Sequence, residues 1–170
     1  MNRIGVIAGS FDPITNGHTW LIKEALTIVD HLYIVVGNNP VKKYWFTESE
    51  RMSMVVEVCN KITKVRNDTH MVTITTIDKQ LLVTYAASVN ANCLIRGIRN
   101  AEDFNYEAQM LLINRKIEPE MRTVFFIPPR ELTEVSSSTV KGIVGYDGWK
   151  DIVAQYVDPL VLDQLERKQS

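Results

Sequence analysis

The chain has 170 residues, of which 45% are hydrophobic and 23% are charged, a composition typical of globular proteins that bury a sizeable core. Its length favours a single domain over residues 1–170. The formal net charge of −1 argues against a protein that coats nucleic acid, although it leaves room for a local basic site.

Apolar runs rich in β-branched residues recur along the chain, and most of the gaps between them have helical periodicity. The runs cover residues 4–8, 32–36, 71–75, 93–95 and 123–127. Apolar strands alternating with helices predict an α/β fold with a doubly wound parallel sheet, whose ligands bind at the carboxyl ends of the strands. A helical tail is expected over about residues 149–170, with its last helix over residues 158–170.

The first strand runs directly into the segment GSFDPITNGH, residues 9–18. Pro13 and Gly17 punctuate a loop, and His18 opens a helical pattern, so we place His18 at a helix start. Free backbone N–H groups and the helix dipole favour a bound phosphate there, and an imidazole adds one more donor. Taken alone, the same residue types are also typical of an ordinary tight loop.

Adjacent lysines, Lys42 and Lys43, follow the second strand and precede a helix that Thr47 and Glu50 begin with capping-box spacing. Paired lysines in a loop are usually solvated surface. At a strand end, however, a flexible ammonium group can reach over and neutralise a phosphate. We therefore take Lys42 as a candidate phosphate ligand, with Lys43 as its neighbour.

Two arginines, Arg96 and Arg99, leave the fourth strand around Gly97. Guanidinium groups bind phosphate bidentately, and Gly97 allows a ligand to approach the backbone closely. The alternative is that both arginines form ordinary salt bridges with nearby carboxylates. Those carboxylates are Glu102, Asp103 and Glu107.

After the fifth strand, Ser136, Ser137 and Ser138 stand at an expected helix start. Their backbone N–H groups and hydroxyls favour an anion, whereas the alternative is simple N-capping.

Cys59 and Cys93 lack metal-ligand spacing and are expected to be buried free thiols. No signal-peptide pattern and no apolar stretch long enough to span a bilayer is found, so we expect a cytoplasmic protein without a membrane partner.

In order and spacing from residue 4 to residue 141, these segments resemble bacterial phosphopantetheine adenylyltransferases of the nucleotidyltransferase superfamily. The similarity lies in the GSFDPITNGH turn, the Pro-x-Lys-Lys loop, the Ile-Arg-Gly-x-Arg strand end with its downstream Phe-x-Tyr-Glu, an Asn-Arg pair and the Ser-Ser-Ser-x-Val-Lys helix start. The resemblance implies a Rossmann-like nucleotidyltransferase fold. It also implies transfer of the adenylyl group of ATP to 4′-phosphopantetheine, giving dephospho-coenzyme A and pyrophosphate.

The resemblance further assigns residues to each substrate. Those expected at phosphopantetheine are Ser10, Lys42, Leu82, Arg96 and Asn114, with Leu82 on the pantetheine arm. Those expected at ATP are Ser10, Phe11, His18, Gly97, Ile98, Arg99, Glu107, Leu132, Thr133, Glu134, Val135, Ser136, Ser137 and Ser138. The residues expected to carry catalysis are His18, Lys42, Arg99 and Ser138. His18 would stabilise the pentacovalent transition state during in-line attack on the α-phosphorus, without a covalent enzyme intermediate.

By the same resemblance Mg²⁺ is expected to arrive with ATP, without a dedicated protein cage, and the chain is expected to form a homohexamer built as a dimer of trimers. The other histidines, His31 and His70, are expected to be structural or surface residues. An adenylyltransferase with another acceptor, such as nicotinate mononucleotide or glycerol phosphate, and a non-catalytic nucleotide sensor remain alternatives. A dinucleotide-linked oxidoreductase is disfavoured because no GxGxxG follows the first strand.

The chain departs from the family pattern at several positions. Leu132 replaces a common aromatic residue near the adenine, and the segment around Gly145 lacks an arginine that many members carry. Gln80 and Thr84 stand where Gly and Asp are frequent. These departures bear on nucleotide affinity and feedback control more than on the reaction.

Overall fold

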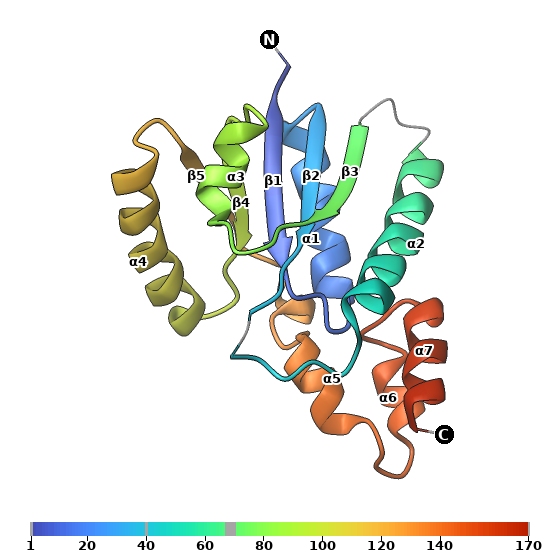
Figure 1. The fold of residues 1–170 in the computed structure, drawn as a ribbon. Coiled ribbons are helices and arrows are strands. Elements are labelled where there is room, and N and C mark those ends of the chain that lie inside the picture. Colours follow the sequence, from blue (N-terminus) through green and yellow to red (C-terminus); the bar gives the residue numbers. More distant parts are fainter. Residues whose placement is uncertain (1, 40, 67–70, 170) are drawn as a thin grey trace.

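The computed structural model describes residues 2–39, 41–66 and 71–169, and its centre is one five-stranded sheet whose strands are all parallel. The strands are β1 (Ile4–Gly9), β2 (His31–Val36), β3 (Met71–Thr76), β4 (Cys93–Gly97) and β5 (Arg122–Phe126). Their spatial order is β3-β2-β1-β4-β5 (Figure 1). The chain therefore winds outward from β1 to β3 and then returns to β4, which makes the β1/β4 edge the switch point of the sheet. The predicted doubly wound parallel sheet is confirmed.

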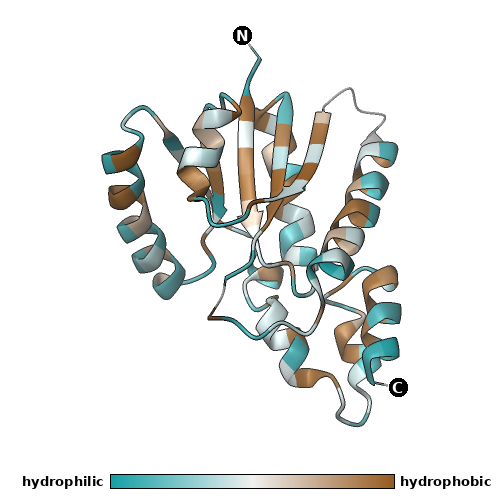
Figure 2. Ribbon diagram, in the orientation of Figure 1, coloured by the Kyte–Doolittle hydropathy of each residue, from teal (hydrophilic) through white to brown (hydrophobic). Residues whose placement is uncertain are grey.

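Helices cover both faces of this sheet. They are α1 (Asn16–Ile28), α2 (Glu48–Arg66), α3 (Leu82–Ser88), α4 (Ala101–Ile117), α5 (Ser137–Ile143), α6 (Trp149–Val153) and α7 (Pro159–Gln169), with a short 3₁₀ turn at Arg130–Leu132. Because side chains alternate along a strand, Ile7 and Ile95 face the cluster that contains α1 and α2, whereas Val6 and Leu94 face α3. In Figure 2 the central strands β1 and β2 are mostly brown, interrupted by paler bands, as expected for strands buried on both faces.

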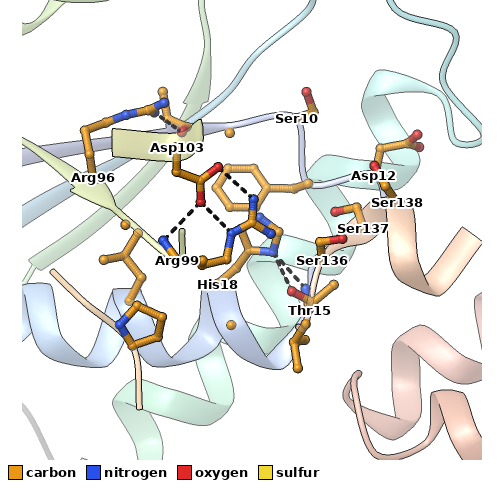
Figure 3. Close-up of a pocket in the computed structure, with 18 of the residues that line it drawn as sticks. Ser10, Asp12, Thr15, His18, Arg96, Arg99, Asp103, Ser136, Ser137 and Ser138 are labelled. Atoms are coloured by element: carbon orange, nitrogen blue, oxygen red, sulfur yellow. Dashed lines mark hydrogen bonds and ion pairs between the residues drawn. The ribbon is translucent and has the colours of Figure 1, made fainter. Parts of the chain in front are cut away.

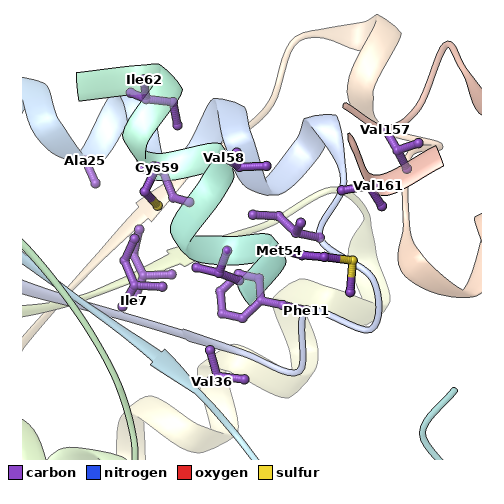
Figure 4. Close-up of a cluster of buried hydrophobic side chains, with 14 of the residues drawn as sticks. Ile7, Phe11, Ala25, Val36, Met54, Val58, Cys59, Ile62, Val157 and Val161 are labelled. Atoms are coloured by element: carbon purple, nitrogen blue, oxygen red, sulfur yellow. The ribbon is translucent and has the colours of Figure 1, made fainter. Parts of the chain in front are cut away.

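The larger of the two cores lies between the sheet and helices α1 and α2 (Figure 4). Phe11, two residues beyond the end of β1, is 1% exposed and belongs to this core together with the α2 side chains Met54 and Val58. Val157 and Val161 extend the same core towards α7. The α1 and α2 helices are therefore anchored by apolar burial, which fixes the turns that precede them.

The predicted boundaries agree with the structure to within one or two residues. The Thr47 and Glu50 capping box is formed, with the Thr47 backbone N–H donating to Glu50 Oε2 at 2.7 Å and the Glu50 N–H to Thr47 Oγ1 at 3.3 Å. The fifth strand is shifted by one residue, because Ile127 is 77% exposed and lies beyond the ladder. The expected C-terminal helical tail corresponds to α6 and α7.

The helix α4 differs from the others because it stands away from the sheet (Figure 1). Only Glu107 of its 17 residues is buried. No helix within the described ranges is long and apolar enough to cross a membrane. Cys59 and Cys93 are both buried free thiols, and burial raises the pKa of Cys59 to about 12.

Candidate active site

The main cavity opens at the carboxyl ends of the strands, beside the β1/β4 switch point, and has a volume of about 540 Å³. The sheet register pairs Ile7 with Ile95, so β1 and β4 end level with each other at its floor. The predicted site residues that line it are Ser10, Phe11, His18, Lys42, Arg96, Gly97, Arg99, Glu107, Leu132, Val135, Ser136, Ser137 and Ser138. The structure thus brings segments far apart in the sequence to one cavity.

His18 lies in the first turn of α1, where its ring has a fixed orientation. The backbone N–H of Thr15 donates to His18 Nδ1 at 3.0 Å, and the Thr15 hydroxyl lies 2.9 Å from the same atom (Figure 3). A nitrogen that accepts a backbone N–H carries no proton, so the proton of the neutral ring is on Nε2. The Phe11 ring supports the imidazole from the side, with ring centroids 5.0 Å apart. His18 is therefore built as a hydrogen-bond donor through Nε2.

The electrostatic surroundings of His18 keep it neutral. Burial, and then the positive charge of Arg99, lower the pKa of His18 to about 4. At neutral pH the imidazole is therefore uncharged. Such a group can donate a hydrogen bond to developing negative charge, but it is a poor general acid.

Both arginines of the β4 end are paired with carboxylates of α4. Arg96 donates through Nε to Glu107 Oε1 at 2.8 Å and through Nη1 to the Ala8 carbonyl at 2.9 Å. Arg99 Nε donates to Asp103 Oδ2 at 2.9 Å. Burial opposes ionisation of Asp103, but the hydrogen bonds from Arg99 outweigh it and hold the pKa of Asp103 below its usual value. Both arginines therefore form the salt bridges that the sequence left open as an alternative, Arg96 with Glu107 and Arg99 with Asp103. All four residues line the cavity.

Gly97 leaves open space at the same strand end. A Cβ added there would meet only Leu21, at 3.6 Å, which is an ordinary van der Waals contact. Packing alone therefore does not demand glycine at this position. Gly97 lines the cavity, and the missing side chain leaves the β4 backbone accessible from it.

Asp12 and Lys141, which were not among the predicted site residues, form an ion pair in the cavity wall. Lys141 Nζ donates to Asp12 Oδ2 at 2.7 Å. Asp12 is 2% exposed, and its other oxygen accepts the Phe46 backbone N–H at 2.9 Å. The only sequence signal was their membership of the GSFDPITNGH and Ser-Ser-Ser-x-Val-Lys segments. This pair joins the first turn to the loop before α2 and to α5.

The serine segment combines the two alternatives left open by the sequence. Ser136 is the N-cap of α5, because its hydroxyl accepts the Thr139 backbone N–H at 3.0 Å. The Ser137 hydroxyl donates to the Pro13 carbonyl at 2.8 Å and so holds the segment against the first turn. Ser138 is exposed at the cavity edge (Figure 3). The serine segment thus caps α5 through Ser136 and also places the polar side chain of Ser138 at the edge of the cavity.

Several other predicted residues lie apart from the lining of this cavity. They are Ile98, Leu82, Asn114, Thr133 and Glu134. Leu82 begins α3 and packs at the edge of the smaller core. Asn114 follows Glu107 by two turns of α4 and so lies on the same side of that helix.

The lysine pair lies on the open side of the cavity, where both side chains are exposed. Their ammonium groups can therefore reach a ligand without losing a structural contact.

His31 has a structural role, because it stacks on Tyr33 and shares a 2.8 Å hydrogen bond with Thr73 Oγ1. His70 lies outside the described residues.

Comparison with known proteins assigns the chain to a family. The sequence profile of the cytidylyltransferase-like family matches residues 6–143. A phosphopantetheine adenylyltransferase of Chromobacterium violaceum is 45% identical over 152 residues, which is 89% of this chain and 88% of that protein. One of Neisseria meningitidis serogroup B is 41% identical over 163 residues, or 96% of this chain and 92% of that protein.

A solved structure shares the fold at much lower identity. The nicotinic acid mononucleotide adenylyltransferase of Plasmodium falciparum, complexed with NaAD, aligns with a TM-score of 0.66 at 14% identity, covering 98% of this chain and 96% of that one. This likeness bears on the fold alone, whereas the closer sequence relatives bear on the family. Their identity over most of both chains shows that this chain belongs to the phosphopantetheine adenylyltransferase family of nucleotidyltransferases.

Proposed function

We propose that this chain transfers the adenylyl group of ATP to 4′-phosphopantetheine, giving dephospho-coenzyme A and pyrophosphate. The observation that carries the proposal is the neutral His18, which presents Nε2–H at a cavity rimmed by Lys42 and Arg99. A donor of this kind stabilises the negative charge on the oxygens of the phosphoryl group in the transition state. The relatives at 41–45% identity are named for the same activity.

The reaction needs positioning more than proton transfer. A phosphate monoester has a second pKa of about 6, so an oxygen of the acceptor phosphate is already an anionic nucleophile at neutral pH. That oxygen bonds to the α-phosphorus as the bond from α-phosphorus to the bridging oxygen breaks, and pyrophosphate leaves with the electron pair. No general base is required, which agrees with the low pKa of His18 and with an Nδ1 that already accepts the Thr15 N–H.

Charge neutralisation is divided between two groups of residues. We assign the 4′-phosphate to Lys42 and Arg96, with the Ser10 hydroxyl beside it. We assign the leaving β- and γ-phosphates to Arg99 and Ser138, while His18 donates to the α-phosphate. Leu82 and Asn114 lie further along the sheet edge and α4, and they are proposed to meet the pantetheine arm.

The adenosine half is proposed to lie along the opposite side of the cavity. The residues assigned to it are Phe11, Gly97, Ile98, Glu107, Leu132, Thr133, Glu134, Val135, Ser136 and Ser137. Leu132 offers aliphatic packing where an aromatic ring would stack, so we expect weaker adenine binding than an aromatic residue would give.

Mg²⁺ is proposed to enter as MgATP. The carboxylates of the cavity are all engaged by cations, since Asp12 binds Lys141, Asp103 binds Arg99 and Glu107 binds Arg96. Phosphate oxygens are then the natural ligands, as in sites where magnesium keeps its waters and arrives on the nucleotide.

Self-association into a hexamer is proposed through α4, whose exposed surface carries several large apolar side chains. Phe104, Tyr106, Leu112 and Ile113 are 55%, 58%, 62% and 48% exposed. This is more apolar surface than a free-standing helix tolerates, and Figure 2 shows apolar residues on the turns near its C-terminal end. A second copy of this chain would cover it. We further propose a cytoplasmic location for this activity.

The test is pyrophosphate release with purified protein, MgATP and either 4′-phosphopantetheine or nicotinate mononucleotide. Turnover with phosphopantetheine alone supports the proposed reaction and acceptor. Turnover only with nicotinate mononucleotide would keep the reaction class and overturn the acceptor. Binding of ATP without turnover on either acceptor would favour a sensing module instead.

A further inference from the structure

Among the residues that the structure describes, Arg51 is the largest fully buried side chain, with an exposed fraction of 1%. It belongs to the first turn of α2 and reaches under the two loops that follow β1 and β2. Its Nη1 donates to the Ser10 carbonyl at 2.6 Å and to the Gly37 carbonyl at 3.0 Å, and its Nη2 donates to Asn38 Oδ1. No motif pointed to this residue.

The charge of Arg51 has no counter-ion among the described residues. Its acceptors are two carbonyls and one amide, the Tyr44 ring lies 4.2 Å from Cζ, and Nε is buried without a partner. Arg96, Arg99 and Lys141 in the same region each have a carboxylate. A buried cation without a carboxylate is costly, and a nearby anion lowers that cost.

The contacts of Arg51 also orient the phosphate-binding turn. The carbonyl and N–H of a trans peptide point in opposite directions, so tying the Ser10 carbonyl to the buried Arg51 turns the Phe11 N–H away from it. Phe11 has a φ of +48°, an unfavourable conformation for a bulky residue. Within the described ranges its N–H has no acceptor, and the residue lines the cavity. The strained turn thus presents an open backbone donor.

The two loops are joined at a second point. The Gly37 N–H donates to the Gly9 carbonyl at 2.8 Å, next to the two carbonyls that Arg51 bridges. The position of the turn that carries Ser10 and Phe11 is therefore coupled to the loop that carries Lys42. The Arg51 guanidinium and this backbone hydrogen bond together set the spacing between the two sides of the cavity.

We propose that Arg51 is a positioning residue for phosphoryl transfer, which bridges the two loops, holds the Phe11 N–H open for a phosphate and supplies an uncompensated positive charge that the bound phosphates balance. This inference rests on the proposed function and extends it to a residue that does not touch substrate. The two roles of Arg51 can be tested separately. Bridging the two loops needs the several donors of a planar guanidinium group, whereas supplying the positive charge needs only a cation.

The experiment measures binding of adenosine, AMP and ATP by calorimetry, and turnover by pyrophosphate release, for the wild type, Arg51→Met and Arg51→Lys. Arg3→Met is the matched control, because Arg3 pairs with Asp30 at the amino end of β1, away from the cavity. For Arg51→Met we expect ATP affinity to fall about 10-fold more than adenosine affinity, as a nearby unscreened charge requires. Arg51→Lys is expected to keep the gain in affinity from adenosine to ATP while kcat falls about 10-fold or more, because one ammonium cannot hold both carbonyls.

Equal loss of affinity for adenosine and ATP in Arg51→Met would show a merely structural role and overturn the proposal. If the Arg51→Lys variant had the same kcat as the wild type, the proposed bridging role of Arg51 would be overturned. Circular dichroism checks the fold, and if Arg51→Met does not fold, Arg51→Gln, which also removes the charge but keeps a polar side chain that can donate hydrogen bonds, decides the charge part by the same comparison of ATP with adenosine. Wild-type protein that binds ATP without turnover would refute the proposed function but leave the binding comparison intact, and failure to bind ATP would overturn both.

Discussion

Thr15 and His18 form a closed pair at the start of α1, in which the Thr15 backbone N–H and hydroxyl both face His18 Nδ1, at 3.0 and 2.9 Å. The pair satisfies a free N–H of the helix start and at the same time fixes the tautomer of the ring. Helix capping and the orientation of the donor therefore depend on the same side chain, so a test of His18 has to separate them.

Replacing His18 by Ala removes the Nε2 donor and is expected to lower kcat by about 10²–10³, the usual effect of losing a transition-state donor. His18→Asn is the matched variant, because its amide oxygen can accept the Thr15 N–H while nothing reaches the position of Nε2. We expect His18→Asn to be as slow as His18→Ala but more stable to urea. Near-normal kcat in a folded, ATP-binding His18→Ala would show that His18 has another role.

The depressed pKa of His18 predicts how stability depends on pH. The folded ring binds a proton only near pH 4, whereas the unfolded one does so near 6.5, so the unfolded state binds more protons between these values. The free energy of unfolding should then fall as pH is lowered through this window, by about 1–2 kcal/mol between pH 7 and pH 5 from His18 alone. Urea denaturation at the two pH values measures it.

His18→Asn is again the control, because His31, whose pKa burial also lowers, is present in both proteins. The difference in pH dependence between the two proteins therefore isolates His18. An identical pH dependence in wild type and variant would contradict a buried neutral ring.

The strand and helix pattern of this chain was readable because the apolar runs are short, continuous and bounded by Gly, Pro and capping residues. Thr47 and Glu50 gave the start of α2 from local chemistry alone. The pairing of Asp12 with Lys141 was not readable, since the two residues are 129 positions apart and neither has local periodicity. Arg51 could not be predicted for a similar reason, because in the sequence it is one more charged residue in the polar first turn of a helix. Long-range charge burial is decided by the packing of loops, which local patterns do not encode.

Asp12 is expected to be a main determinant of stability in the cavity wall. Asp12→Ala would leave the buried Phe46 N–H and the Lys141 ammonium without their acceptor, at a cost of about 3–5 kcal/mol. Asp12→Asn keeps one oxygen and should cost less. Urea denaturation measures both, with Lys61→Ala as control, because that substitution breaks an exposed ion pair with Asp158 and should cost under about 1 kcal/mol. A loss in Asp12→Ala no larger than in the control would contradict this account.

Arg96 is expected to govern binding of the acceptor. In Arg96→Met we expect KM for 4′-phosphopantetheine to rise about 10- to 100-fold with a smaller change in KM for ATP, because a charge-assisted contact to one phosphate is lost. The control is Arg122→Met, which removes the same charge from the exposed start of β5, at the opposite end of the sheet. Equal changes in both KM values would give Arg96 a structural role with Glu107, and a larger change in KM for ATP would place it at ATP.

Assembly through α4 makes a prediction that is independent of catalysis. Leu112 is 62% exposed on this helix, which has only one buried residue, so a carboxylate at this position costs the monomer little and a helix-packed interface a great deal. We expect the wild type to run as a hexamer in light scattering and Leu112→Asp to dissociate into smaller species with an unchanged monomer fold by circular dichroism. Val65→Asp is the matched control, because Val65 is 86% exposed on α2, away from α4. A wild type that is monomeric at every concentration, or a Leu112→Asp variant that remains hexameric, would exclude α4 as the assembly surface, and in the first case the exposed apolar residues of α4 would need another partner.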